Sequence, residues 1–189
     1  FSFSNKRWIT HDEAASNILI EQTGALGFHR PGSFDKIVDI DQCLLQDDFS
    51  NRIRNFVRTF AVNHVFSFYD TQSQKGFLRN MIVRNTTQNE WMLMMIFGYH
   101  DSEKIQLMMN AIQTKFPEIT SLNYIINVKV NDTIYDREVK LWSGNPYIVE
   151  KLGEIKYQIG PKSFFQTNTQ QALKLFDVAV DFADLKLTD

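Results

Sequence analysis

The stretch EWMLMMIFGYHDSEKIQLMMNAIQTKFPEIT, residues 90–120, decides the fold. Its first part is apolar at almost every position, which is typical of a strand buried on both faces in the centre of a sheet. Asp101 then suits the N-cap of a helix, and Pro117 suits the position just beyond its end. Between them, apolar residues recur at helical spacing: Ile105, Met108, Met109, Ile112 and Phe116. The segment therefore predicts a central strand over residues 90–100 and a helix over residues 101–116.

More strands and two more helices are predicted on either side of this unit. Residues 77–85 form a strand-like run that pairs with residues 90–100 through a tight polar loop. The other expected strands are residues 1–8, 24–28, 34–40, 119–130, 137–142, 147–151 and 155–159, and residues 9–23 are expected to be loop. Strands outnumber helices and hairpins outnumber crossovers. The predicted fold class is therefore α+β, with a mainly antiparallel sheet and packed helices.

The two further helices are indicated by apolar stripes. The earlier helix carries Phe49, Ile53, Phe56, Val57 and Phe60. The last helix starts near Thr167 or Asn168, where residues 167–170 fit a capping box. Its expected stripe is Leu173, Phe176, Val180 and Ala183.

Composition indicates a folded chain that carries no strong overall charge. Hydrophobic residues make up 43% of the 189 residues, and the formal net charge is −2. A nucleic-acid-binding domain is usually basic, so any RNA contact must come from local groups. No apolar run reaches the roughly 18 residues of a membrane span, and no signal peptide opens the chain. Cys43 is the single cysteine, which excludes an internal disulfide, and we expect a cytoplasmic protein.

Motifs of catalysis are missing from the sequence. It contains neither of the glycine-rich phosphate-binding patterns, and its four histidines stand at no metal-ligand spacing. The opening FSFS and the closing residues 182–189 both predict boundaries inside a longer protein. From the residues alone, we expect no catalytic apparatus in this chain.

Three stretches remain as candidate sites, each with a simpler alternative. Lys6 and Arg7 stand beside Trp8, where they could bind phosphate while the ring stacks on a base, or they could be a solvated strand end. Cys43 alone is commonly a buried structural residue. The loop that contains Phe164 and Gln166 offers aromatic and amide groups just before a helix N-terminus, which suits a polar ligand, but composition alone favours a simple capped loop.

The same stretches carry a resemblance to a known family. PKSFFQTNTQQA (residues 161–172) resembles the segment that opens the S-adenosylmethionine-binding domain of bacterial RNA (uracil-5-)-methyltransferases. Residues 1–8, 25–46 and 119–153 resemble consecutive upstream segments of that family, so the likeness runs nearly from end to end. It fits the ribosomal-RNA branch better than the transfer-RNA branch, because the segment leading to the cysteine is present.

The resemblance implies roles for individual residues. Gln166 matches a glutamine that contacts S-adenosylmethionine, and Phe164 matches an aromatic in the pocket for the flipped uracil. Cys43 matches the last of four cysteines that hold a [4Fe–4S] cluster in the parent protein. One thiolate cannot hold a cluster that needs four, so we expect none in this chain by itself. Lys6 and Arg7, which the residues alone single out, are the expected contacts to the RNA substrate.

The resemblance also implies a division into domains. Residues 1–163 correspond to the central α+β domain, and residues 164–189 to the first helix of a truncated Rossmann-like methyltransferase domain. The family's nucleophilic cysteine and glutamate base lie beyond these segments. We therefore expect no catalytic residue in this chain and no activity from the fragment alone.

The predicted function is that of an S-adenosylmethionine-dependent enzyme that forms 5-methyluridine in ribosomal RNA. Its partner is RNA, not DNA and not a membrane. The alternatives are a transfer-RNA uracil-5-methyltransferase and a non-catalytic module that binds RNA or protein. The sequence leaves the target uridine and the oligomeric state open.

Overall fold

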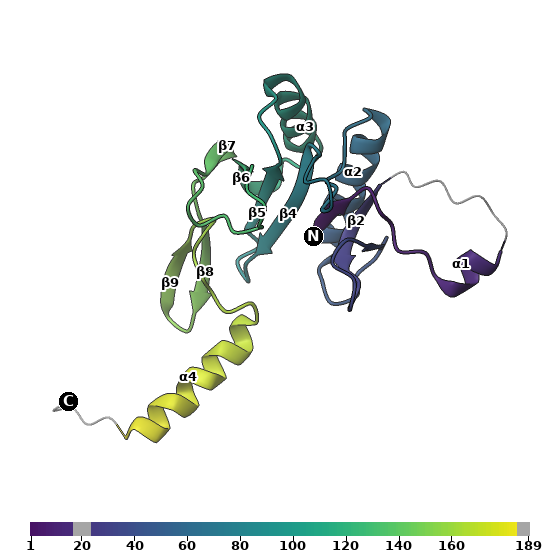
Figure 1. The fold of residues 1–189 in the computed structure, drawn as a ribbon. Helices are drawn as coiled ribbons and strands as arrows, with labels where there is room; N and C mark the ends of the chain where they lie inside the picture. Colours follow the sequence, from purple (N-terminus) through teal and green to yellow (C-terminus); the bar gives the residue numbers. More distant parts are fainter. Residues whose placement is uncertain (17–23, 185–189) are drawn as a thin grey trace.

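A seven-stranded sheet forms the body of the protein, in the strand order β3-β2-β1-β4-β5-β6-β7 (Figure 1). The computed structural model describes residues 1–16 and 24–184. The strands of this sheet are β1 (Ser2–Ser4), β2 (Ala25–His29), β3 (Ile37–Asp39), β4 (Leu78–Asn85), β5 (Trp91–Phe97), β6 (Ile119–Ile126) and β7 (Lys140–Gly144). Neighbouring strands are antiparallel except for β5 and β6, which run parallel. The prediction of an α+β fold with a mainly antiparallel sheet is confirmed.

Strand β5 is buried along its whole length, as predicted from its apolar run. On one face, Leu93, Met95 and Phe97 pack into the largest core. Two helices cover this face, α2 (Asp48–Asn63) and α3 (Ser102–Lys115) (Figure 1). Helix α3 is the crossover that makes β5 and β6 parallel, and Asp101 caps it by accepting a hydrogen bond from the Lys104 amide at 3.1 Å.

The opposite face of β5 is covered by less regular structure. Met94 and Ile96 pack with Ile125 of β6 and with partly buried residues of the segment 127–139. Met92 packs under a separate two-stranded hairpin made of β8 (Ile148–Leu152) and β9 (Ile155–Ile159). This second face is the one that carries the candidate site.

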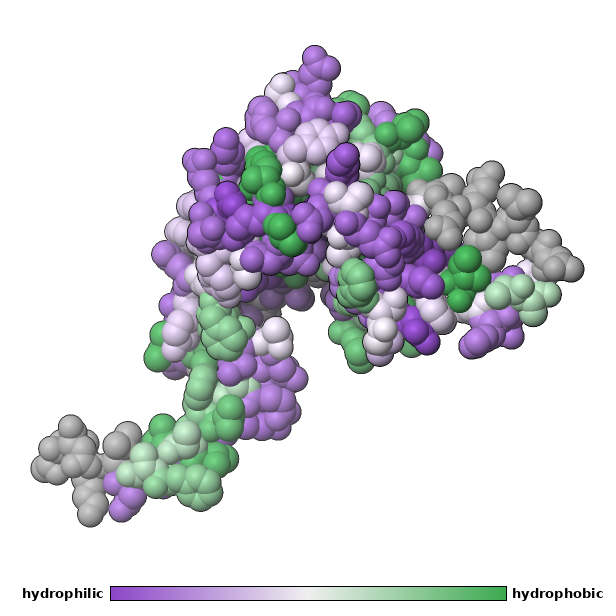
Figure 2. All heavy atoms as spheres, in the orientation of Figure 1, coloured by the Kyte–Doolittle hydropathy of each residue, from purple (hydrophilic) through white to green (hydrophobic). Residues whose placement is uncertain are grey.

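Helix α4 (Thr169–Ala183) follows the hairpin and projects away from the body (Figure 1). Its existence is confirmed, but the expected stripe does not pack into a core. Leu173, Phe176 and Val180 are 39%, 45% and 54% exposed, and Ala172 is the buried residue of the helix. Figure 2 shows the helix as a mostly hydrophobic arm beside a mostly polar body. The helical spacing of apolar residues predicted the helix. It could not predict that the described residues leave the apolar side of the helix uncovered.

Two predictions about the N-terminal third were wrong. The strand expected over residues 1–8 is confined to β1, Ser2–Ser4. Residues 9–23 were expected to be loop, but residues His11–Ala15 form the short helix α1. Thr10 explains this helix, since its hydroxyl accepts from the Glu13 amide at 3.2 Å while the Glu13 carboxylate accepts from the Thr10 amide at 2.9 Å. Residues 17–23 lie outside the described residues.

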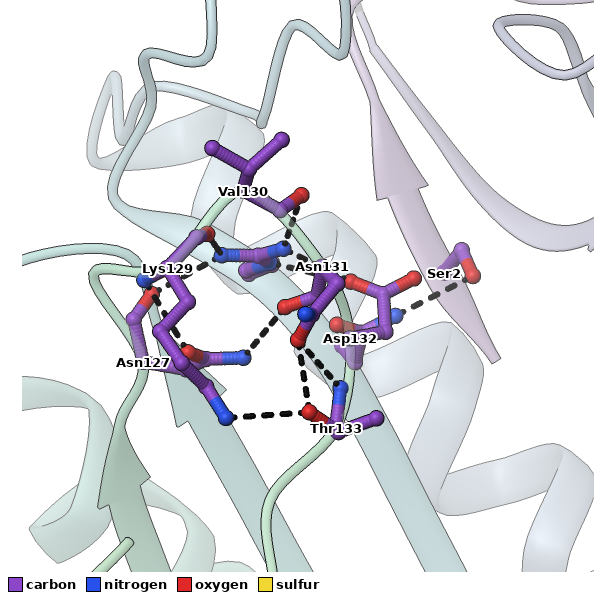
Figure 3. Close-up of polar contacts among 9 residues, drawn as sticks. Ser2, Asn127, Lys129, Val130, Asn131, Asp132 and Thr133 are labelled. Carbon is purple, nitrogen blue, oxygen red and sulfur yellow. Dashed lines mark hydrogen bonds and ion pairs between the residues drawn. The ribbon is translucent and has the colours of Figure 1, made fainter. Parts of the chain in front are cut away.

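The strand expected over residues 119–130 ends at Ile126, because the chain then turns around a buried arginine. The Arg79 guanidinium, on β4, donates to the carbonyls of Asn127 at 3.0 Å and Val130 at 3.1 Å. It also donates to the Lys129 carbonyl and, through Nε at 3.0 Å, to the Asp132 carboxylate. Figure 3 shows the loop groups drawn together around this point. A charge buried away from water needs such partners, so the loop takes its shape from the arginine.

Burial of β5 predicts a large difference between two leucine substitutions. Leu93→Ala leaves a cavity in the core and should lower the free energy of unfolding by about 2–5 kcal/mol. Leu107→Ala, on the half-exposed side of α3, should cost about 1 kcal/mol or less. Urea denaturation of both variants measures this. Equal losses would contradict the two-sided burial of the strand.

Candidate functional site

The loop between β9 and α4, residues 160–168, is anchored to the body by cations. Arg84 of β4 donates through Nη1 to the carbonyls of Gly160 at 3.2 Å and Ser163 at 2.7 Å. Lys162 donates through Nζ to the Tyr135 carbonyl at 3.0 Å. A turn at Pro161 is closed by the Ser163 amide, which donates to the Gly160 carbonyl at 3.1 Å. The backbone ahead of α4 is therefore held in one place.

The two phenylalanines of this loop point in different directions. Phe165 packs with Met92, Ile148 and Ile159, and its ring centroid lies 5.6 Å from that of Tyr157. Phe164 is 83% exposed. Phe164 is therefore not a core residue, and its neighbour Phe165 fills that role. Phe164 offers a free aromatic face at a fixed position.

Helix α4 begins at a well-defined cap. Asn168 is the N-cap, and its side chain accepts from the Gln171 amide at 3.0 Å. The helix start expected near Thr167 or Asn168 is confirmed, with the N-cap at Asn168 and not at Thr167, where the expected capping box begins. Thr169, in the first turn, donates through its hydroxyl to the Glu150 carboxylate at 2.9 Å. The start of the helix is tied to the hairpin by this bond.

Glu150 of β8 is a buried carboxylate that joins three segments. It is 2% exposed and accepts from the backbone amides of Thr87 at 3.1 Å and Lys151 at 2.8 Å, as well as from Thr169. Burial by itself would raise the pKa of Glu150, but the hydrogen bonds, first those from Thr87, lower the pKa below its ordinary value. The carboxylate is therefore held ionised.

A small pocket opens where these groups meet. It has a volume of about 140 Å³, and Arg84, Glu150, Phe165, Gln166, Thr167 and Thr169 are among its lining residues. Burial lowers the pKa of the Arg84 guanidinium. Ligand pockets commonly have volumes of about 300–1,000 Å³, so this one suits an edge of a larger molecule. Gln166 and the threonine hydroxyls offer donors and acceptors for such an edge.

The structure places Lys6 and Arg7 away from this pocket. Lys6 lies 3.4 Å from an Asp35 oxygen and 3.6 Å from one of Asp70, and Arg7 lies 2.8 Å from one of Glu13. Both cations therefore have acidic partners that would compete with phosphate. Their contact with RNA stays a prediction.

Cys43 lies in the loop between β3 and α2, fastened by hydrogen bonds to Asn51. The Cys43 amide donates to Asn51 Oδ1 at 2.9 Å, and Asn51 Nδ2 donates back to the Cys43 carbonyl at 3.3 Å. Within residues 1–16 and 24–184, no group of three or more His, Cys, Asp or Glu side chains is placed to hold a metal ion. A [4Fe–4S] cluster takes four thiolates, so these residues do not fit one.

Arg84 and Glu150 are the residues of the candidate site that sequence reasoning missed. Each interrupts an apolar strand run, in MIVRN and in YIVEKL. A charged residue inside such a run indicates a buried charge with a dedicated partner. That signal could have singled out Arg84 and Glu150, but not their partners. Gly160 lies 76 residues from Arg84, and Thr87 lies 63 residues from Glu150.

Comparisons with known proteins show what the chain is similar to. No protein-family model matches it. It is 46% identical to an uncharacterized RNA methyltransferase of Bacteroides thetaiotaomicron, over 98% of this chain and 41% of the relative. It is 40% identical to one of Porphyromonas gingivalis, with the same coverage of 98% and 41%. The chain thus spans about two fifths of the length of these relatives.

A solved structure gives the same indication. The Pyrococcus abyssi tRNA (uracil-54, C5)-methyltransferase, in complex with S-adenosyl-L-homocysteine, is 28% identical in sequence and matches with a TM-score of 0.63. The match covers 77% of this chain and 35% of that protein. None of the helices in the described part of the chain is long and apolar enough to cross a membrane.

The hydrogen bonds of Glu150 predict a pH-dependent stability. Because its folded pKa is depressed, the carboxylate stabilises the fold above the ordinary glutamate pKa of about 4.3, and this contribution is lost as pH falls through the folded value. Glu150→Gln should unfold about 1–2 kcal/mol more easily at neutral pH. The difference should shrink in acid.

Denaturation curves recorded from pH 7 downward test this. Glu154→Gln, at a side chain that is 95% exposed, is the matched control and should behave like the original protein. A Glu150→Gln deficit that stays constant across the pH range would show that the effect is one of packing and not of charge.

Proposed function

Because this chain belongs to the RNA methyltransferase family, we propose that the whole protein transfers a methyl group from S-adenosylmethionine to C5 of a uridine in RNA. The observation that carries the proposal is the anchored loop before α4. There Phe164 is exposed, while Gln166 lines the adjacent pocket. An aromatic face and an amide held side by side suit a flipped base and the polar edge of a cofactor.

Each residue of the loop has a distinct proposed task. Phe164 stacks on the target uracil once the base has left the RNA strand. Gln166 hydrogen-bonds S-adenosylmethionine, which supplies the methyl group when it is bound. Arg84 and Glu150 are positioning residues, since they fix the loop and the start of α4 through backbone and hydroxyl contacts. The catalytic thiolate and base belong to the rest of the enzyme.

We propose ribosomal RNA as the substrate, on the strength of the segment that leads to Cys43. The Pyrococcus abyssi protein is a tRNA methyltransferase, and the likeness to it supports the chemistry more than the choice of RNA. In the whole protein, Cys43 would be one ligand of a [4Fe–4S] cluster, with the other thiolates supplied from outside this chain. Iron analysis of the anaerobically purified protein tests this part separately.

The proposed domain boundary lies at residue 163, with the methyltransferase domain beginning at residue 164. The supporting observation is α4, whose exposed apolar side chains include Phe176 and Phe182, 45% and 87% exposed. Large apolar groups gathered on one element normally pack against something, and a Rossmann-like domain that continues from this helix would cover them. The proposed location of the enzyme is the cytoplasm.

Methyl transfer can be tested directly with the full-length gene product. It is incubated with methyl-labelled S-adenosylmethionine and unmodified ribosomal or transfer RNA, and the digested RNA is analysed for 5-methyluridine by mass spectrometry. We expect the label at C5 of uridine in ribosomal RNA. Label in transfer RNA alone would correct the substrate, and RNA binding without any methyl transfer would favour the non-catalytic module.

The two phenylalanines predict opposite phenotypes. Phe164→Ala should weaken RNA binding by about 1–3 kcal/mol, the usual worth of one base–aromatic stack, without changing the melting temperature. Phe165→Ala should lower the melting temperature, because Phe165 packs with Met92 and Ile148. RNA affinity and thermal melts measured on both variants separate binding from packing.

Gln166→Ala should raise the KM for S-adenosylmethionine and leave the affinity for RNA nearly unchanged. The side chain is exposed, so its removal leaves no cavity in the core. Steady-state kinetics with each substrate varied in turn give the two constants. A variant that melts early but has unchanged constants would mean that Gln166 only supports the start of the helix.

A further inference from the structure

We propose that the RNA strand flanking the target uridine lies along a track formed by Phe164, Tyr135 and Phe34, with one unstacked base on each ring. The inference rests on the proposed function and extends it, because it names the part of the protein that holds the substrate on one side of the reacting base. The track runs from the loop before α4, across the segment 127–139, to the β2–β3 hairpin.

Three adjoining hollows define the course of the track. The first is the 140 Å³ pocket beside Gln166. Arg84 lines both this pocket and a second hollow of about 460 Å³, whose other walls include Tyr135 and Lys162. Asp132 lines both the second hollow and a third, of about 330 Å³, whose walls include Phe34. Shared walls make the hollows neighbours, so a single extended strand could pass through all three.

Each part of the track presents an exposed aromatic ring. Phe164, Tyr135 and Phe34 are 83%, 75% and 67% exposed. Because every base has a π-face, isolated rings of this kind bind single-stranded RNA with little regard to sequence. The hollows offer the space that an unstacked base needs, and the third also has the amide of Asn80 on its wall, which can pair with a base edge.

Cations lie along the same path, beside the carboxylates of Glu150 and of Asp132, the second of which pairs with Arg79, and the whole chain has a net charge of −2. Lys162 and Arg84 donate to backbone carbonyls, and neither takes part in an ion pair among the residues that the structure describes. A carbonyl does not neutralise a cation as a carboxylate does. Lys162 and Arg84 therefore attract a phosphate backbone. Lys6 and Arg7 attract it less, because each has an acidic partner.

The middle of the track is preorganised by Arg79. Its guanidinium is buried, and its hydrogen bonds to Asn127, Val130 and Asp132 hold the segment in one shape (Figure 3). The loop therefore loses little freedom when RNA binds, which leaves more of the stacking energy as affinity.

A protein partner fits this surface less well than RNA does. Protein-binding surfaces usually have a contiguous apolar centre from which charged groups are excluded. Here the rings are separate, and amide and cationic groups stand between them. This spacing suits successive bases of one strand better than the packed centre of a protein interface.

A nested series of RNA lengths tests the track in the full-length gene product. Fluorescence anisotropy gives the dissociation constant for labelled single-stranded RNAs that are centred on one uridine and extended stepwise on either side. Tyr135→Ala should raise the dissociation constant about 5- to 100-fold for RNAs long enough to reach it, and Tyr135→Phe should keep it within about 2-fold. Phe34→Ala should show its effect only with longer RNAs than those that detect Tyr135→Ala.

Controls keep binding, folding and the proposed chemistry apart. All three rings are exposed, so the melting temperatures should stay unchanged, as should the KM for S-adenosylmethionine in Tyr135→Ala and Phe34→Ala. Leu45→Ala, at a residue that is 96% exposed and off the track, should behave as the original protein.

Three outcomes decide the matter. A length-ordered loss, first for Tyr135 and then for Phe34, establishes the track. Normal RNA binding and methylation by both alanine variants overturns it and leaves the proposed function standing. If the original protein neither binds nor methylates RNA, while the two alanine substitutions weaken binding of a purified protein partner, both proposals fail and the surface is a protein interface.

Discussion

Two-sided burial of β5 is the constraint on which the rest of the structure depends. A strand with apolar side chains on both faces must be covered twice. Helices α2 and α3 cover the face that carries Leu93, Met95 and Phe97. Segment 127–139 and the β8–β9 hairpin cover the other face. The candidate site grows out of this second cover, since Phe165 completes the small core over Met92 and thereby turns Phe164 outward. The same packing that stabilises the sheet thus leaves the ring of Phe164 exposed.

Buried charges give the irregular cover its definite shape. Segment 127–139 has few packed side chains of its own, and it turns around Arg79, whose donors would otherwise be buried without partners. Glu150 does the same for the first turn of α4, and Arg84 for the turn at Gly160. Loops held by hydrogen bonds to their backbone are free to point their side chains at solvent. This is how exposed rings such as Tyr135 and Phe164 can coexist with a well-positioned chain.

The regular elements were predictable from the sequence because they follow from local patterns. The apolar run of β5, the period of α3 and its two ends all lie within residues 90–120. What could not be predicted depends on distant partners. Strand β6 was expected to continue through Val128 and Val130, whose alternation suits a strand, but Arg79 lies 48 and 51 residues before its carbonyl partners Asn127 and Val130. Lys6 likewise contacts Asp35, which lies 29 residues further along the chain. The sequence could not show that this carboxylate neutralises the cation.

The net charge of a whole chain does not decide whether one of its surfaces attracts RNA, for a physical reason. Net charge counts every cation equally, whereas attraction for phosphate depends on whether an acid already neutralises the cation. Many of the cations here are paired with carboxylates, as Arg58 is with Asp39 at 2.7 Å. Arg84 and Lys162 instead bond to carbonyls beside the exposed rings. The proposed track has two cations, Arg84 and Lys162, that pair with no carboxylate among the described residues, and three exposed rings, so its affinity should come mainly from stacking. RNA recognition by a slightly acidic domain is therefore consistent with its chemistry, provided that the target strand is unpaired and its bases can leave the stack.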